Sequence, residues 1–177
     1  GIIQGKLIAE YWKNHPEMDK NKDGVLQYVM LKGEPGHQDA ELRTLHSVKT
    51  IEEAGIKVEK VAEDTAMWDR VKGQDKMASF LAAYENIEAV LANNDDMALG
   101  AIEALKAVGY FTGDKFMPVV GVDATVPGKE ALRAKTLLGT SLNDAKGQGY
   151  AVVKVTKALC EGLVPSKENV GAVVEGK

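Results

Sequence analysis

The chain has 177 residues, of which 45% are hydrophobic, and it carries a formal net charge of −4. This length supports one well-buried core, and the mild acidity without a basic stripe argues against a nucleic-acid partner. No apolar run approaches the length of a membrane span, and the single cysteine, Cys160, excludes an intramolecular disulfide.

Helical and extended patterns alternate along the chain. The expected helices lie near residues 2–14, 38–54, 69–84, 96–108, 127–134 and 144–161. The expected strands are the apolar runs Leu26–Leu31, Ile56–Val61, Ile87–Ala92, Pro118–Val122 and Leu137–Leu142. Short buried strands between helices are typical of βαβ units. We therefore expect an α/β fold in which a parallel sheet lies between two helical layers, a three-layer αβα arrangement.

The first eight residues, GIIQGKLI, have neither the basic region nor the long apolar stretch of a signal peptide. They have the pattern of an amphipathic helix that is already under way. We therefore expect the natural N-terminus, with any targeting signal, to lie upstream of this sequence.

Polar or aromatic residues follow each expected strand. They are Gly33–Asp39, Asp64–Asp69, Asn93–Asp96, Asp123 and Asn143–Asp144. In open α/β sheets, ligands bind at the carboxyl edge of the strands. Any single Asn or Asp at such a place can instead be a helix N-cap. Five such clusters, one of them with a tryptophan, favour a binding site.

The first of these clusters continues into a predicted helix that carries His37, Asp39 and Arg43. Asp39 and Arg43 are four residues apart and share a helix face, so the carboxylate can orient the guanidinium group toward a ligand. A surface ion pair is the alternative interpretation. Trp68, in a loop, offers a flat apolar face that suits the C–H face of a sugar, with core packing as the alternative.

No catalytic constellation accompanies these groups. The sequence has no nucleophile elbow, and Cys160 lies inside a predicted helix, far in sequence from any cluster of histidines. The stretch from Gly121 to Lys129 has the wrong spacing for a phosphate-binding loop. Recognition groups without a nucleophile or an activated base indicate a binding protein and not an enzyme.

The stretch Asp19–Gln27, DKNKDGVLQ, has oxygen-bearing side chains at alternate positions, followed by a glycine. This pattern is typical of the beginning of an EF-hand calcium loop. An EF-hand closes with a glutamate at its twelfth position, which here is Met30, and a thioether does not bind a hard cation. The stretch is therefore either a solvated turn rich in Asp and Asn or a calcium site closed by a residue from elsewhere.

Six stretches of the chain resemble the bacterial galactose/glucose-binding proteins, the periplasmic components of sugar ABC transporters. They are DKNKDGVLQ, LKGEPGHQDAELR, DTAMWD, ANNDDMALGAIEALKA, VVGVDA and LNDA. Members of this family have two α/β lobes that clamp the sugar at a hinge. The resemblance implies a type I periplasmic-binding-protein-like lobe, with residues 1–143 as the C-terminal lobe. Residues 144–177 would then belong with an N-terminal lobe that this sequence does not contain.

The resemblance also implies two sites, and each matched position holds the residue type of the family. The implied ligands of a structural Ca²⁺ are Asp19, Asn21, Asp23, the carbonyl of Val25, Gln27 and Glu88. The residues implied to hydrogen-bond a sugar are His37, Asp39, Arg43, Asn94, Asp123 and Asn143. Trp68 would stack on one face of the pyranose ring.

The implied function is binding of D-galactose or D-glucose for an ABC permease, and in some relatives also for a chemoreceptor in chemotaxis. The implied location is the periplasm or, with a lipid anchor, the outer surface of a bacterium. An alternative is the sugar-sensing core of a LacI-type transcriptional regulator, whose helix-turn-helix would lie upstream. The calcium loop favours the extracytoplasmic protein. A sugar-modifying α/β enzyme is a third interpretation, which no catalytic constellation in the sequence supports.

Overall fold

A computed structural model describes residues 1–171 of the chain. The chain divides into two compact units, residues 1–142 and the segment that begins at Asn143. Each unit is described by itself. The assignment of residues 1–143 and 144–177 to two different lobes stays a prediction.

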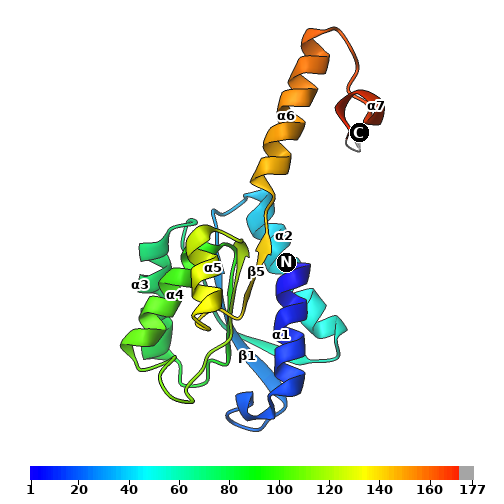
Figure 1. Cartoon of the computed structure of the whole chain (residues 1–177). Coiled ribbons are helices and arrows are strands. Elements are labelled where there is room, and N and C mark those ends of the chain that lie inside the picture. Colours follow the sequence, from blue (N-terminus) through cyan, green and yellow to red (C-terminus); the bar gives the residue numbers. More distant parts are fainter. Residues whose placement is uncertain (172–177) are drawn as a thin grey trace. The chain divides into compact units, whose positions relative to one another are not determined.

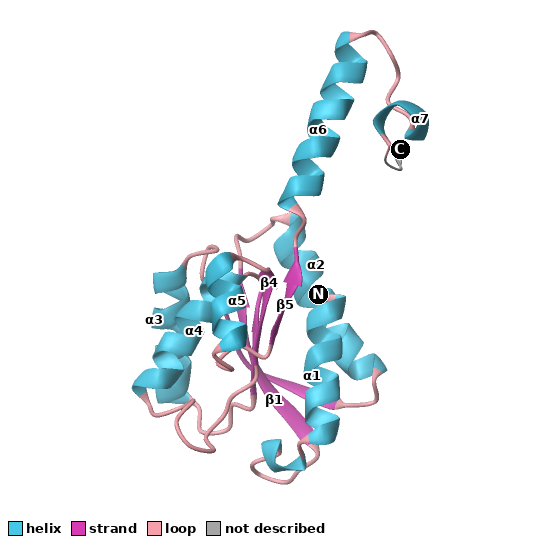
Figure 2. Ribbon diagram, viewed as in Figure 1, coloured by secondary structure: helices cyan, strands magenta, loops and turns pink. Residues whose placement is uncertain are grey.

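The first unit is built on a five-stranded parallel sheet, drawn in magenta in Figure 2. Its strands are β1 (Val25–Lys32), β2 (Lys57–Thr65), β3 (Ala89–Ala92), β4 (Val119–Asp123) and β5 (Gly139–Leu142). Their order across the sheet is β2-β1-β3-β4-β5. The chain therefore reverses its direction across the sheet between β1 and β3. Such a switch point is where ligands bind in open α/β sheets, at the carboxyl ends of the strands.

Helices cover both faces of this sheet (Figure 1). The helices α1 (Ile2–Asn14) and α2 (Gln38–Glu53) pack together on one face. On the other face lie α3 (Arg70–Ala83), α4 (Asp95–Ala107) and α5 (Val126–Arg133). The predicted three-layer α/β fold is confirmed.

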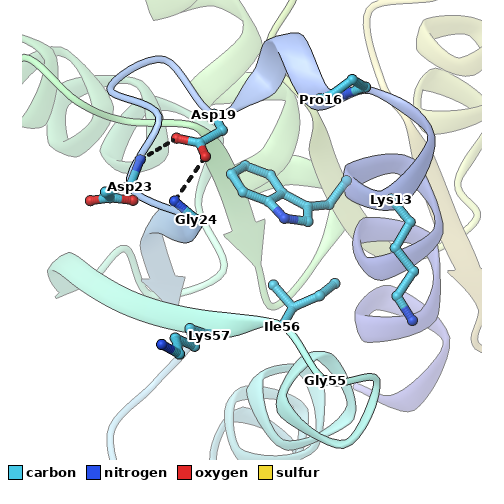
Figure 3. A pocket seen from close by; sticks show the side chains of 9 residues that line it. Lys13, Pro16, Asp19, Asp23, Gly24, Gly55, Ile56 and Lys57 are labelled. Atoms are coloured by element: carbon cyan, nitrogen blue, oxygen red, sulfur yellow. Dashed lines mark hydrogen bonds between the residues drawn. The ribbon is translucent and has the colours of Figure 1, made fainter.

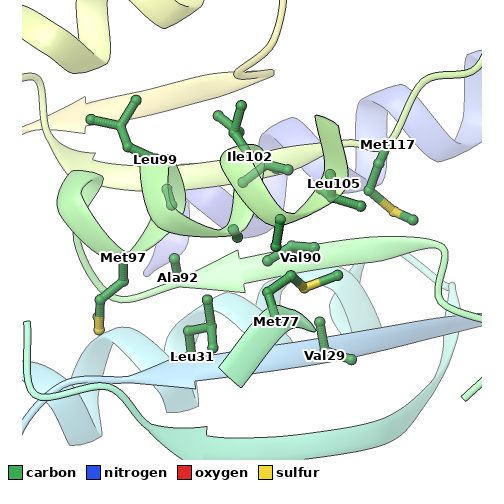
Figure 4. Close-up of a cluster of buried hydrophobic side chains, with 14 of the residues drawn as sticks. Val29, Leu31, Met77, Val90, Ala92, Met97, Leu99, Ile102, Leu105 and Met117 are labelled. Carbon is green, nitrogen blue, oxygen red and sulfur yellow. The ribbon is translucent and has the colours of Figure 1, made fainter. Parts of the chain in front are cut away.

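The central strands are buried on both faces because helices cover both sides of a parallel sheet. Val29, Met30 and Leu31 of β1 are each 0% exposed, as are Val90 of β3 and Val119 of β4. Figure 4 shows how Met77 of α3 and Leu105 of α4 close over β1 and β3. Each fully buried side chain of this size contributes about 1.5–3 kcal/mol to folding, so the sheet is a rigid base for the residues at its edge.

Three features of the first unit depart from the prediction. The strand β2 continues to Thr65, beyond the predicted end at Val61, where charged residues interrupt the apolar run. Charged residues are tolerated there because β2 is an edge strand and they face solvent. A short 3₁₀ helix, η1 (Pro16–Met18), follows α1 and was not predicted. Glu88 lies directly before β3 and not within the strand.

The second unit contains α6 (Ala145–Cys160) and the short helix α7 (Lys167–Val170), and residues 172–177 lie outside the described part. Asp144 caps α6 by accepting a hydrogen bond from the Gly147 backbone N–H at 3.0 Å. The predicted apolar side chains of α6 are Tyr150, Val152, Val153, Val155 and Leu159, and all except the half-buried Val155 are exposed. Among residues 1–171, no helix has the length and apolar character required to cross a membrane.

Candidate functional site

Arg43 is the centre of the polar groups at the carboxyl edge of the sheet. It lies on α2, and its side chain is only 14% exposed. Its Nη2 donates a hydrogen bond to Asp39 Oδ2 at 2.9 Å, and its Nη1 donates to the backbone oxygen of Asn93 at 2.8 Å. Nη1 also lies 3.6 Å from Asp123 Oδ1. Three connections of the fold therefore converge on one guanidinium group, whose remaining N–H groups can donate to a ligand.

Trp68 lies beside this guanidinium group. The Arg43 guanidinium carbon is 5.6 Å from the centre of the indole ring, and the His37 ring meets the indole edge-on with centroids 5.2 Å apart. Trp68 and Met67 both have positive φ, 64° and 53°. Because this conformation is unfavourable for side chains with a Cβ, the surrounding structure must hold the turn in place.

His37 and Asn94 both cap helices, which agrees with the N-cap alternative given for Asn94 and was not predicted for His37. His37 is the N-cap of α2, and its Nδ1 accepts from the Asp39 backbone N–H at 3.2 Å. Asn94 is the N-cap of α4, and its Oδ1 accepts from the Met97 backbone N–H at 3.0 Å. Asn94 Nδ2 also donates to the backbone oxygen of Trp68 at 3.1 Å, which ties the cap to the aromatic turn.

Six of the seven predicted sugar-binding residues thus lie at one edge of the first unit, at the carboxyl end of β4 or in the loops and helix starts that follow β1, β2 and β3. Asp39 and Arg43 also line a hollow of about 440 Å³, whose other lining residues are Gly1, Ile2, Ile3, Leu42, His46 and Ser141 and none of the other predicted sugar-binding residues. The seventh residue, Asn143, belongs to the second unit, where its Oδ1 accepts from Gln148 Nε2 at 2.7 Å. The role of all seven in sugar binding stays a prediction.

Comparison with known proteins adds evidence that is independent of this geometry. Residues 1–163 match the family model described as the periplasmic binding protein domain. The chain belongs to the periplasmic binding protein family. The D-galactose/methyl-galactoside binding periplasmic protein MglB of Haemophilus influenzae is 45% identical to it over 164 residues, which are 92% of this chain and 48% of that protein.

Other relatives of this periplasmic binding protein domain have different ligands in their names. The ribose import binding protein RbsB of Escherichia coli is 32% identical over 139 residues, 78% of this chain and 43% of that protein. An ABC transporter solute binding protein of Bacillus halodurans, solved with bound myo-inositol, has a TM-score of 0.73 at 36% identity, covering 97% of this chain and 60% of that one. The chain spans about half the length of the curated relatives named here. A family of binding proteins agrees with the prediction that the chain is not an enzyme.

The predicted calcium loop precedes β1, at the opposite end of the sheet. Asp19 accepts from the backbone N–H groups of Asp23 at 3.1 Å and Gly24 at 2.8 Å (Figure 3). Glu88 Oε1 accepts from the Lys20 N–H at 2.7 Å, and its Oε2 accepts from the Gln27 N–H at 2.9 Å. The distant glutamate therefore does reach the loop, and it closes the loop through backbone hydrogen bonds.

The same loop contains oxygen atoms that suit a hard cation. Within residues 1–171, the buried Gln27 Oε1 accepts no hydrogen bond. Burial raises the pKa of Glu88, and the neighbouring Asp19 carboxylate raises it further, against the opposing effect of the two N–H donors. In contrast, the Val25 N–H lowers the pKa of Asp23. However, no group of three His, Cys, Asp or Glu side chains in the described part of the chain is arranged to hold a metal ion, so the calcium site stays a prediction.

Three residues that support the site lie in the predicted polar clusters, but the sequence prediction gave them no individual role. Gly33 is required because a Cβ at this position would lie 2.2 Å from the Trp68 ring. Asn93, 1% exposed, accepts from the Gly33 N–H at 3.0 Å through its side chain while its backbone oxygen holds Arg43. Asp95 is 0% exposed. In the sequence, Asn93 and Asp95 are members of one polar run, ANNDD, and nothing in that run distinguishes the buried members from the exposed Asp96.

Proposed function

We propose that this chain supplies sugar-binding groups of an extracytoplasmic solute-binding protein, which delivers a hexose of the galactose or glucose type to an ABC permease. The observation that carries this proposal is the convergence of Arg43, Asp39, His37, Asp123 and Trp68 at the carboxyl edge of the sheet. The identity with a protein named for D-galactose favours a hexose within the broader family.

The chemistry of these groups suits a sugar. Each hydroxyl group both donates and accepts hydrogen bonds, and a buried hydroxyl without a partner costs about 1–3 kcal/mol. Arg43 supplies donors, the carboxylates of Asp39 and Asp123 supply acceptors, and the indole face of Trp68 can cover the C–H face of a ring. In the same proposal the full-length protein presents its sugar-bound form to the permease and, in chemotaxis, to a chemoreceptor.

Calorimetric titration of the full-length protein tests the proposal directly. We expect saturable binding of D-galactose or D-glucose with a dissociation constant of about 1 μM or lower. D-Ribose and myo-inositol serve as comparison ligands in the same buffer. Binding of only these two would contradict the hexose assignment, and no binding of any of the four would contradict the sugar-binding proposal.

We also propose a structural Ca²⁺ bound by Asp19, Asn21, Asp23, the Val25 carbonyl, Gln27 and Glu88. The ligands are all oxygen atoms, which calcium prefers, and Gln27 Oε1 is a buried acceptor with no hydrogen bond among the described residues. Bound calcium would favour the ionised form of Glu88 and offset its repulsion with Asp19.

Calcium is therefore expected to stabilise the protein against thermal unfolding. At about one hundred times its dissociation constant, calcium should add about 2.7 kcal/mol to the free energy of unfolding. Differential scanning calorimetry with calcium, magnesium or a chelator measures this gain. Asp19→Asn should remove most of it, and Asp75→Asn, an exposed carboxylate on α3, should not. An unchanged unfolding midpoint of the parent protein with calcium would contradict the site.

A further inference from the structure

Asp95, in the first turn of α4, is a fully buried carboxylate next to the candidate site. Its Oδ2 accepts hydrogen bonds from the Thr125 backbone N–H at 2.8 Å and from the Thr125 hydroxyl at 3.0 Å. Its Oδ1 accepts from the Thr140 hydroxyl at 2.6 Å. None of the ion pairs within residues 1–171 includes Asp95, so its carboxylate oxygens are held by the neutral donors of Thr125 and Thr140.

Two glycines leave the space that this carboxylate occupies. A Cβ at Gly121 would lie 2.4 Å from Asp95 Oδ1, and a Cβ at Gly128 would lie 2.2 Å from Asp95 Oδ2. Neither glycine has a positive φ, so the backbone conformation does not explain them. Glycine is needed at both positions because β4 and α5 approach the Asp95 carboxylate closely.

The segment held by Asp95 is the turn at the carboxyl end of β4, which begins at Asp123, the last residue of the strand, and continues through Ala124. Both residues have positive φ, 114° and 52°, and such a conformation persists only where the surroundings hold it. The Ala124 N–H donates to the Thr140 hydroxyl at 3.1 Å, and that hydroxyl donates to Asp95. Asp95 therefore holds the turn at two points. It accepts hydrogen bonds from Thr125, the residue after Ala124, and from the Thr140 hydroxyl, which itself accepts from the Ala124 N–H.

We propose that Asp95 is a positioning residue, which fixes this turn so that the Asp123 carboxylate faces the ligand beside Arg43. The turn carries Asp123, whose Oδ1 lies 3.6 Å from Arg43 Nη1. The function of this placement rests on the proposed sugar binding, while the fastening itself rests only on the hydrogen bonds. A ligand-binding group held in advance loses little conformational freedom when the ligand binds.

The fastening is tested by Asp95→Asn, which keeps the shape of the side chain and removes one acceptor position. Asp96→Asn is the matched control, because Asp96 is in the same helical turn, has a side chain that is 48% exposed and pairs with Arg70. Amide hydrogen exchange followed by NMR is the measurement. In Asp95→Asn, amide exchange at Ala124 and Thr125 should become at least about tenfold faster. The ratio of the exchange rates of Val29 and Val90, two core residues, should stay unchanged.

The positioning role is tested by titration of the full-length protein with D-galactose. Asp95→Asn and Thr140→Val should each weaken binding by about tenfold. Thr140→Ser restores the hydroxyl and should bind as the parent protein does, as should Asp96→Asn. If the role is purely structural, the substitutions will lower the unfolding midpoint, but Thr140→Val and Thr140→Ser will not differ in their affinity for D-galactose. If Asp95→Asn does not fold, the two Thr140 variants carry the test.

The outcomes separate the two proposals. Unchanged exchange at Ala124 and Thr125 in Asp95→Asn would overturn the fastening. Faster exchange with unchanged affinity for D-galactose would overturn the positioning role. If the parent protein binds none of the four ligands named above, the sugar-binding proposal fails and the positioning role fails with it, and the exchange measurement alone then decides whether Asp95 holds the turn.

Discussion

Arg43→Lys is expected to weaken sugar binding by about a hundredfold while the protein remains folded. A lysine keeps the positive charge, but a single ammonium group cannot reproduce a planar guanidinium that contacts Asp39, Asn93 and Asp123 together. If the lysine variant loses two hydrogen bonds to charged groups, at about 1.5 kcal/mol each, the affinity falls by about a hundredfold. Calorimetric titration with D-galactose measures the affinity.

Arg70→Lys is the matched control for this substitution. Arg70 also pairs with a carboxylate, through Nε at 3.1 Å and Nη2 at 2.6 Å from Asp96 Oδ1, and its side chain is 45% exposed. An exposed pair contributes little to stability, and Arg70 is not among the groups around Trp68, so binding should not change. Equal affinities of Arg43→Lys and the parent protein would show that the Arg43 side chain does not contact the sugar.

Gly33→Ala is expected to displace the Trp68 ring and to destabilise the protein by about 1–3 kcal/mol. The backbone of Gly33 cannot move aside easily, because its N–H donates to Asn93 Oδ1 at 3.0 Å and its oxygen accepts from the Thr65 hydroxyl at 2.6 Å. The new methyl group, 2.2 Å from the indole, must therefore push the ring. Sugar affinity should fall with the loss of the stacking surface.

Fluorescence makes the displacement visible. In a Trp12→Phe background Trp68 is the only tryptophan, and its emission should shift to longer wavelength in Gly33→Ala as the ring becomes exposed. Gly149→Ala is the control. It makes the same glycine-to-alanine substitution in α6, where a Cβ meets no atom within 4 Å among the described residues. Emission that is the same in Gly33→Ala and its parent would contradict the proposed packing of Gly33 against Trp68.

The sheet and its helices could be predicted because their signals are local and repeated. Apolar runs such as Leu26–Leu31 can be buried on both faces only between helices, and the structure places them there. The pairing of Asp39 with Arg43 followed from the four-residue spacing, and the two groups are indeed 2.9 Å apart. The alternation of strands and helices then placed the polar residues at the carboxyl ends of parallel strands.

Contacts between distant segments could not be predicted from local patterns, and the approach of Glu88 to the loop before β1 was expected only from the family resemblance. The role of Gly33 depends on an indole that is 35 positions further along the chain, and the role of Asp95 depends on Thr125 before α5 and on Thr140 of β5. The edge strand β2 was predicted too short because its charged outer residues interrupt the apolar run. For Gly33 and Asp95 the deciding partner is a neighbour in space that no local pattern identifies.

The distribution of the candidate site over separate connections has a consequence for how such proteins diversify. The groups around Trp68 come from four different segments, while β1, β3 and β4 are buried and paired in parallel. A mutation in one segment can therefore change one contact to a ligand without altering the scaffold or the other contacts. This modularity provides a stepwise evolutionary route between specificities within one fold, in a family whose members have names as different as galactose and ribose.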